Sequence, residues 1–219
     1  AGKWRGIPVH VVMPSNAPTI KQAAVRSYGG QITFCEPTLE ARESTAREIV
    51  ERTGATFIHP YDNEQVIAGQ GTAALEVLED LPEVGLMLTA VGGGGLLSGS
   101  LITVKSVSPQ TRVIAAEPAR VDDAYRSWKE GRIVENEKID TIADGLRTNL
   151  GEKTFPIIHE LVDDIVLVEE EKILHALRVV LERMKIVIEP SSAVPVAAVL
   201  AGKIDVAGKR VAIHLGPKN

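Results

Sequence analysis

Four consecutive glycines at positions 92–95 form the stretch of this sequence whose residue types point most directly to chemistry. An apolar run that reads as a strand, residues 84–91, precedes them, and a segment with helical character, residues 96–107, follows. Glycines leave the main-chain N–H groups at a helix start open to an anion, which the helix dipole also favours. The pattern predicts a phosphate-binding turn; close packing of the strand against the helix is the alternative.

The residues around this turn narrow the kind of phosphate that it could bind. A P-loop would place a lysine after the last glycines, where this sequence has Leu96 and Leu97. The dinucleotide pattern G-x-G-x-x-G fits at its first two glycines, but the last glycine is displaced to Gly99. A dinucleotide-dependent oxidoreductase needs an acidic residue about 20 positions further on. That residue would be Glu117, whose own surroundings favour a cation, so we expect the phosphate of an organic cofactor.

Acidic residues follow the next predicted strand, residues 112–117, in the pattern E-P-x-x-x-D-D. Glu117 ends that strand, Pro118 stops regular pairing beyond it, and Asp122 and Asp123 lie in an irregular segment. Carboxylates and main-chain carbonyls in such a place suit Mg²⁺, Mn²⁺ or Ca²⁺. A solvated acidic loop, or capping of the following helix by Asp122, is the alternative. The five histidines show no metal-ligand spacing.

Strand-like and helix-like segments alternate along the whole chain, which favours an α/β fold with parallel strands and right-handed crossovers. The first part reads as a small βαβαβ unit, and the polar, glycine-bearing stretch at residues 60–71 is the predicted junction with a longer series. The predicted strands are residues 7–13, 31–35, 56–58, 85–91, 112–117, 164–168 and 210–215. The predicted helices are residues 19–28, 44–52, 72–79, 96–107, 125–129, 169–185 and 191–200.

Composition excludes several classes of protein. The 219 residues, 44% hydrophobic and 24% charged, are typical of a globular protein with a real core. A net charge of −5 without a basic stripe argues against nucleic acid or an anionic membrane as a partner. No apolar run approaches the roughly 20 residues of a membrane span, and no signal peptide opens the chain. The single cysteine, Cys35, excludes an internal disulfide and fits a reducing compartment, so we expect a cytoplasmic protein.

Both ends of the sequence read as cut. Residues 1–6 resemble the tail of a helix with no start signal before it, and only four residues follow the last predicted strand. A strand at the centre of a doubly wound sheet usually leads into another element of structure. We therefore expect the chain to be part of a longer enzyme.

Several short motifs recur in one order and carry a family resemblance. They are F-C-E-P at 34–37, I-A-G-Q-G-T at 67–72, V-G-G-G-G-L-L-S-G at 91–99, A-A-E-P at 115–118, T-I-A-D-G-L at 141–146 and E-R-M-K-I-V-I-E-P-S at 182–191. Together they resemble serine racemases and the related serine/threonine dehydratases, which are pyridoxal-phosphate (PLP) enzymes of the tryptophan-synthase β fold. The resemblance implies parallel and mixed sheets flanked by helices, incomplete at the N-terminus. It also implies a small-domain portion at residues 1–60 and a large PLP-binding portion at residues 61–219.

The resemblance assigns cofactor and substrate roles to individual residues. Glu189 resembles the acidic residue near the cofactor ring, and Arg42 resembles a small-domain residue that meets the substrate carboxylate. Asp144 resembles part of a segment beside the bound amino acid, for which a plain turn is the alternative. The implied cofactor-binding positions are Gly92, Gly93, Gly94, Gly95 and Gly216.

The resemblance also implies a cation, an effector and a second subunit. Mg²⁺, or else Mn²⁺ or Ca²⁺, would bind Glu117, the main-chain carbonyl of Val121 and Asp123. An ATP effector would bind between subunits of a homodimer, with ordinary surface positions as the alternative for the residues concerned. The implied nucleotide-site residues are Lys21, Tyr28 and Lys185.

Two departures from the family pattern bear on activity. The family's Schiff-base lysine and its S-S-G-N-H-G loop, which carries a serine base, lie upstream of the region that matches this sequence. After the last strand the family usually has S-G-G-N, whose serine bonds the pyridine nitrogen of the cofactor. This sequence has G-P-K-N there, beginning at Gly216, and glycine has no hydroxyl group.

The leading hypothesis is therefore a PLP-dependent racemase or ammonia-lyase acting on serine, threonine or 3-hydroxyaspartate. Because chemistry at the α-carbon of an amino acid on PLP needs a lysine amine, we expect this chain alone to be inactive. The alternative hypothesis is a catalytically inactive remnant of the PLP fold that binds a divalent cation or phosphate. Retained Mg²⁺ binding without covalent attachment of PLP would favour the alternative.

Overall fold

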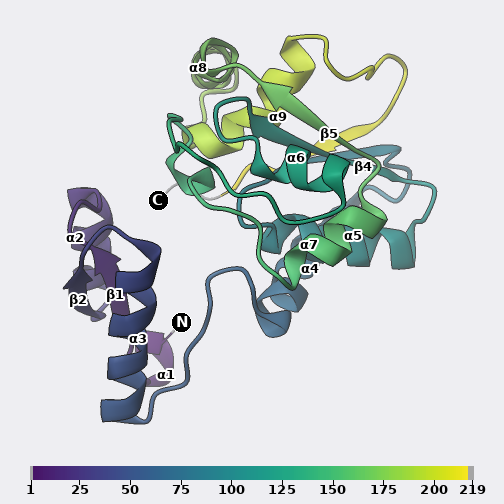
Figure 1. The fold of residues 1–219 in the computed structure, drawn as a ribbon. Coiled ribbons are helices and arrows are strands. Elements are labelled where there is room, and N and C mark those ends of the chain that lie inside the picture. The colour runs from purple at the N-terminus through teal and green to yellow at the C-terminus, as the bar shows by residue number, and fades with distance from the viewer. Residues whose placement is uncertain (1, 217–219) are drawn as a thin grey trace. The chain divides into compact units, whose positions relative to one another are not determined.

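The computed structural model describes residues 2–216, which form two compact units, one ending at Ile58 and the other beginning at His59 (Figure 1). The first unit contains α1 (Gly2–Arg5), β1 (His10–Pro14), α2 (Thr19–Ser27), β2 (Gln31–Cys35) and α3 (Leu39–Thr53). β1 and β2 pair in parallel, with Val12 opposite Thr33. Helix α3 begins where the Thr38 hydroxyl accepts the N–H of Ala41 at 3.1 Å, and its C-cap is Gly54; the predicted helix, residues 44–52, lies within it.

The predicted third strand of this unit, residues 56–58, is wrong. In the described chain this segment forms no strand, and β1 and β2 pair only with each other. Phe57 is 52% exposed and Ile58 is 68% exposed. Residues with high strand propensity need a neighbouring strand to pair with, and within residues 2–216 this segment has none. The unit is therefore βαβα after its first helix.

The second unit is built around a four-stranded parallel sheet in the order β5-β4-β3-β6. Its strands are β3 (Leu86–Ala90), β4 (Arg112–Pro118), β5 (Asp164–Val168) and β6 (Val211–Ile213). Its helices are α4 (Glu64–Asp80), α5 (Gly95–Val107), α6 (Asp123–Glu130), α7 (Thr154–Leu161), α8 (Glu170–Val179) and α9 (Pro190–Leu200), with short helical turns η1 (Asp144–Leu146) and η2 (Val180–Met184).

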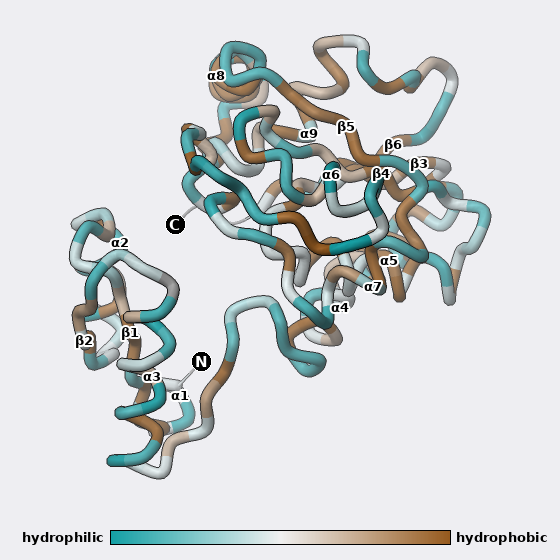
Figure 2. Tube along the Cα trace, in the orientation of Figure 1, coloured by the Kyte–Doolittle hydropathy of each residue, from teal (hydrophilic) through white to brown (hydrophobic). Residues whose placement is uncertain are grey.

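Alternate side chains of the sheet enter two hydrophobic cores, one on each face. Met87 and Val113 belong to the core that residues of α4, α5, α6 and α7 complete. Leu88 and Ile114 belong to the core under α8 and α9. Figure 1 shows these two sets of helices on opposite sides of the sheet, and β5 is mostly hydrophobic in Figure 2. Successive side chains of a strand point to opposite faces of the sheet, so a parallel sheet that is covered on both faces needs apolar residues at successive positions.

Three helical segments differ from the prediction. Helix α4 begins at Glu64 because Asn63 Oδ1 accepts two main-chain N–H groups at 2.9 and 3.2 Å, so most of the predicted junction at 60–71 is helical. Helix α7 is absent from the predicted elements. The predicted helix 169–185 divides into α8 and the π-helical turn η2, after which Lys185 has a φ of 60°. None of the described helices combines the length and apolar character that crossing a membrane requires.

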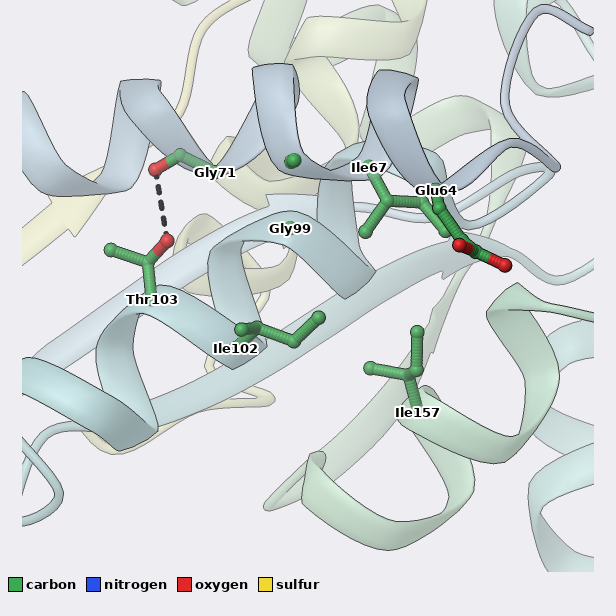
Figure 3. A pocket seen from close by; sticks show the side chains of 8 residues that line it. Glu64, Ile67, Gly71, Gly99, Ile102, Thr103 and Ile157 are labelled. Carbon is green, nitrogen blue, oxygen red and sulfur yellow. Dashed lines mark hydrogen bonds between the residues drawn. The ribbon is translucent and has the colours of Figure 1, made fainter.

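Helices α4 and α5 touch through their backbones. A Cβ atom on Gly71 would lie 2.9 Å from the carbonyl oxygen of Gly99, and a Cβ atom on Gly99 would overlap the backbone of α4. The Thr103 hydroxyl donates to the Gly71 carbonyl at 3.1 Å across this contact (Figure 3). An apolar pocket of about 180 Å³ lies beside it. Its lining residues are Glu64, Ile67, Ala68, Gly71, Gly99, Ile102, Thr103 and Ile157.

Candidate functional site

Neighbouring strands bring several predicted site residues to one edge of the sheet. The glycine turn follows β3, Glu117 lies near the end of β4, and Gly216 follows β6. These three strands are adjacent and parallel, so their carboxyl ends lie at the same edge. Open parallel α/β sheets bind their ligands at that edge.

The glycine turn offers main-chain donors without acceptors. All four glycines are buried, and the N–H groups from Gly92 to Leu97 have no hydrogen-bond acceptor within residues 2–216. The N–H groups on either side, those of Val91 and Ser98, are both bonded to carbonyls, at 3.1 and 2.8 Å. Unpaired buried N–H groups are costly, and the first turn of a helix is where free donors collect. A phosphate group would satisfy them.

Packing also requires glycine in the turn. A Cβ atom on Gly93 would overlap the Tyr61 ring, and one on Gly95 would lie 2.9 Å from Tyr61 Cβ. Gly94 has a φ of 89°, in the left-handed region, and a Cβ atom there would lie 2.7 Å from Ile158 Cδ1. Close packing and anion binding are therefore compatible explanations of the four glycines, because both need bare backbone.

Two side chains hold the turn in place. The hydroxyl of Thr154, which is fully buried, donates to the Gly93 carbonyl at 2.8 Å and accepts the N–H of Gly151 at 2.9 Å. Asp62 Oδ1 accepts the N–H groups of Lys153 and Thr154 at 2.8 and 3.2 Å, which caps α7. Neither Asp62 nor Thr154 was predicted as a site residue from the sequence. The cap lies about 90 residues before the helix that it serves, so no local signal reveals it.

A row of close contacts connects the turn with α9. A Cβ atom on Gly92 would lie 3.5 Å from the Gly145 carbonyl oxygen. A Cβ atom on Gly145 would lie 2.8 Å from Ser191 Oγ and 3.5 Å from Glu189 Oε1. The N–H of Gly145 donates to Ser191 Oγ at 3.1 Å. The structure thus places the segment that contains Asp144 against the glycine turn, and Glu189 against that segment.

Gly216 lies at the far end of this row. A Cβ atom on Gly216 would lie 3.2 Å from Ser192 Oγ and 3.9 Å from Glu189 Oε1. The Ser192 hydroxyl donates to the Gly216 carbonyl at 3.3 Å. The sequence analysis did not select Ser192, although it directly follows the last matching motif. The rest of the G-P-K-N segment lies outside the described residues.

Glu117 and Asp123 are buried acids, each 1% exposed, that tie neighbouring segments together. Both oxygens of Glu117 accept N–H groups from the first turn of α6, each at 2.9 Å. Asp123 accepts Asn136 Nδ2 at 2.6 Å and the N–H of Leu150 at 2.9 Å. Burial raises the pKa of Glu117 well above its usual range, and the nearby charge of Asp123 raises it further. Burial likewise raises the pKa of Asp123 to about 6.

The structure contradicts one of the two alternatives for this acidic segment and bears out the other in position only. The segment is not a solvated loop, because Glu117, Val121 and Asp123 are buried. Asp122 occupies the N-cap position of α6, as this alternative predicted, but its side chain makes no capping bond: it accepts Arg126 Nε at 2.7 Å, while Glu117 accepts the N–H groups of the helix. Within residues 2–216, no group of three or more His, Cys, Asp or Glu side chains could hold a metal ion. The predicted set differs from such a group, because its third ligand is a main-chain carbonyl.

The residues predicted for the substrate carboxylate and for the nucleotide site lie on or beside α2, α3 and η2. Arg42 is exposed on α3, and its Nε donates to the Thr38 carbonyl at 3.3 Å. Lys21 lies on α2, and Tyr28, which is 71% exposed, follows the end of that helix. Lys185 is exposed directly after η2. Their predicted roles stay predictions.

Comparison with known proteins identifies the family. The model of the family described as pyridoxal-phosphate dependent enzyme matches residues 1–216. The chain belongs to this family. The predicted α/β fold and the resemblance to serine racemases and serine/threonine dehydratases are confirmed.

Sequence relatives and solved structures agree on this family. The chain is 50% identical over 202 residues to a serine racemase of Dictyostelium discoideum, covering 91% of this chain and 62% of that protein. It is 44% identical over 213 residues to a β-hydroxyaspartate dehydratase of Paracoccus denitrificans, covering 97% of this chain and 68% of that protein. The structure of maize serine racemase is 38% identical, with a TM-score of 0.94, and covers all of this chain and 68% of its own. The chain thus spans about three fifths of the Dictyostelium relative.

The residues of the glycine turn fit the family's cofactor. PLP carries a phosphate group, and the turn presents a run of buried N–H groups without acceptors at a helix start. Side chains are absent where the phosphate would approach, since residues 92–95 are all glycine. The donor set therefore matches the phosphate end of PLP.

Proposed function

We propose that this protein acts in the PLP-dependent racemisation or β-elimination of hydroxy amino acids, with serine, threonine or 3-hydroxyaspartate as substrate. The observation that carries the proposal is the run of buried, unaccepted N–H groups at the glycine turn. The relatives support the substrate class, since their names include serine racemase and β-hydroxyaspartate dehydratase. Racemisation and β-elimination both begin with loss of the α-proton, so the same site geometry serves either reaction.

The residues of this chain would bind the cofactor and orient the substrate. When bound, PLP supplies an electron sink for negative charge at the α-carbon of the amino acid. The N–H groups of residues 92–97 would hold its phosphate, while Tyr61 and Thr154 keep the turn in shape. Glu189 would lie near the cofactor ring and Asp144 near the bound amino acid. Arg42 would meet the substrate carboxylate, a role that rests on the family resemblance.

A divalent cation at Glu117, the carbonyl of Val121 and Asp123 is part of the proposal. The raised pKa values of both carboxyls show that two buried negative charges are costly here. Oxygen ligands of this kind suit Mg²⁺ or Ca²⁺, whose charge would offset that cost. The cation would stabilise the contacts of α6 with the segments around Asn136 and Leu150 and take no part in proton transfer.

Three further parts of the proposal rest on the family resemblance. Lys21, Tyr28 and Lys185 would contribute to an ATP effector site, the intact enzyme would be a homodimer, and the protein would be cytoplasmic. Calorimetric titration with ATP and light scattering after size-exclusion chromatography test the first two directly. Localisation of a tagged protein in cells tests the third.

Ligand binding tests the central proposal without depending on turnover. The unfolding temperature of the purified chain is measured with PLP, with pyridoxal, which lacks the phosphate, and with inorganic phosphate. We expect PLP and phosphate to raise the unfolding temperature in a saturable way, and pyridoxal to have little effect. Stabilisation by pyridoxal as strong as that by PLP would contradict a phosphate site at the turn.

Turnover separates the proposed activity from its alternative. The part of the Dictyostelium relative outside the aligned residues is joined to this chain, and the chimera is given L-serine, L-threonine or 3-hydroxyaspartate. Formation of the D-enantiomer indicates racemisation, and formation of a keto acid with ammonia indicates β-elimination. PLP or Mg²⁺ binding without either product would favour a catalytically inactive remnant of the PLP fold.

A further inference from the structure

The hydroxyl of Ser192 occupies the space beside Gly216 at the end of β6. Ser192 is 4% exposed, on the first turn of α9. A Cβ atom on Gly216 would lie 3.2 Å from Ser192 Oγ, so this hydroxyl lies directly beside the position that a side chain of residue 216 would take. Its bond to the Gly216 carbonyl, at 3.3 Å, is long for a hydroxyl donor and is therefore easily exchanged for a better acceptor.

This hydroxyl lies on the same side of the sheet edge as the glycine turn. β6 pairs with β3 in parallel, so Gly216 and the turn both follow carboxyl ends of adjacent strands. These segments lie close together, since an added Cβ atom would lie 3.5 Å from the Gly145 oxygen at Gly92, and 3.5 and 3.9 Å from Glu189 Oε1 at Gly145 and Gly216. The glycine turn supplies the N–H donors for an anion, and the Ser192 hydroxyl and the Glu189 carboxylate lie near Gly216 at the other end.

PLP has complementary chemistry at two separate points of its ring. The phosphate arm is a dianion-type acceptor, and the pyridine nitrogen is a second acceptor at another ring position. A buried pyridine nitrogen needs a hydrogen-bond partner, and that partner tunes the electron demand of the ring. A hydroxyl donates to the neutral nitrogen, whereas a carboxylate accepts from the protonated nitrogen.

We propose that the Ser192 hydroxyl donates a hydrogen bond to the pyridine nitrogen of bound PLP, in the space that the absent side chain of Gly216 leaves. The assignment rests on the proposed function, since it requires PLP at the glycine turn. Ser192 is favoured over Glu189 because its oxygen lies closer to the open position, at 3.2 Å against 3.9 Å. The bound ring nitrogen stays unprotonated, which makes the ring a milder electron sink than a pyridinium ring.

Analogue binding tests the assignment without activity. The dissociation constants of PLP and of its 1-deaza analogue, in which C–H replaces the ring nitrogen, are measured by calorimetry on the full chain. We expect the wild-type chain to prefer PLP by roughly threefold to tenfold, the ratio that one neutral hydrogen bond gives. In Ser192→Ala this preference falls to about one, while the affinity for the deaza analogue stays the same.

Two matched variants provide the controls. Ser191→Ala removes the neighbouring hydroxyl, which accepts the N–H of Gly145, and should keep the preference for PLP. Glu189→Gln tests the competing partner. Loss of the preference in Glu189→Gln together with its survival in Ser192→Ala would overturn the assignment and make the carboxylate the partner. Unfolding temperatures of all variants confirm that each is folded.

A spectroscopic measurement gives a second, independent readout. The ¹⁵N resonance of PLP labelled at the ring nitrogen should lie in the range of an unprotonated, hydrogen-bonded pyridine in the wild-type complex. It should move toward the value without a hydrogen bond in Ser192→Ala. A resonance typical of pyridinium in the wild type would overturn the assignment while leaving PLP binding in place. Failure of both PLP and the deaza analogue to bind would instead refute the proposed function, and the assignment with it.

Discussion

Replacing Thr154 by valine removes the hydroxyl that connects the glycine turn to α7. The substitution keeps the size and the β-branch of the side chain. It leaves the Gly93 carbonyl without its 2.8 Å donor and the Gly151 N–H without its 2.9 Å acceptor. Because Thr154 is fully buried, water cannot replace either partner. At about 1–3 kcal/mol for each of the two buried groups left unpaired, the expected loss of unfolding free energy is about 2–6 kcal/mol.

The matched control is Thr103→Val on α5. Its hydroxyl donates only to the Gly71 carbonyl, at 3.1 Å, and that carbonyl lies within helix α4. The control should therefore lose about 1 kcal/mol or less. Thr154→Ser, which keeps the hydroxyl, should recover most of the loss seen in Thr154→Val.

Two measurements decide this prediction. Urea denaturation gives the unfolding free energies, and calorimetry gives the dissociation constant of PLP. Thr154→Val should weaken PLP binding by about tenfold, equivalent to about 1.4 kcal/mol, while Thr103→Val leaves it unchanged. A loss of stability in Thr154→Val no larger than that of Thr103→Val, or PLP binding at wild-type strength, would refute the role given to Thr154.

Three further predictions follow from the same contacts. Without divalent cations, the free energy of unfolding should fall as pH rises from about 4 to 7. The raised pKa values of Glu117 and Asp123 make the folded state bind more protons than the unfolded chain in this range. Mg²⁺ should reduce this fall, and urea titrations at each pH measure both effects. Gly93→Ala should lose stability and saturable PLP binding because its Cβ overlaps Tyr61, whereas Gly69→Ala, in an open position on α4, should keep both in thermal-shift measurements. Asn63→Ala should lose about 1 kcal/mol of unfolding free energy through the lost cap of α4 without changing the affinity for PLP, measured by calorimetry.

Local sequence signals predicted the elements that are fixed by local chemistry. Residues 164–168 form the predicted strand because residues 165–168 are apolar and polar residues bound them, and the predicted helix at 44–52 lies within α3. The strand at 56–58 failed because no strand within residues 2–216 pairs with this segment, and the side chains of Phe57 and Ile58 are both more than half exposed. Helix α7 was missed because its cap, Asp62, comes from a distant part of the chain.

The candidate site likewise contains residues that local sequence reveals and residues that it does not. The glycine turn was recognisable because its meaning is contained in four adjacent residues and their neighbours. The acids at Glu117 and Asp123 were found, but their burial and their main-chain partners depend on how α6 folds back onto β4. Ser192 beside Gly216 could not be found from spacing, because 24 residues and a sheet crossover separate the two.

The contact between Gly71 and Gly99 has a consequence for how this protein can change over evolution. Gly99 lies about one helical turn beyond the glycine turn, so any side chain there would push α5 away from α4. The turn has no slack to absorb such a shift, since Gly94 already abuts Ile158 and Gly92 abuts Leu146. A substitution at Gly99 would therefore be felt as a weakened phosphate site, although residue 99 has no part in that site. Because no residue is smaller than glycine, a substitution at position 99 cannot be compensated by one at position 71, so we expect both positions to remain glycine.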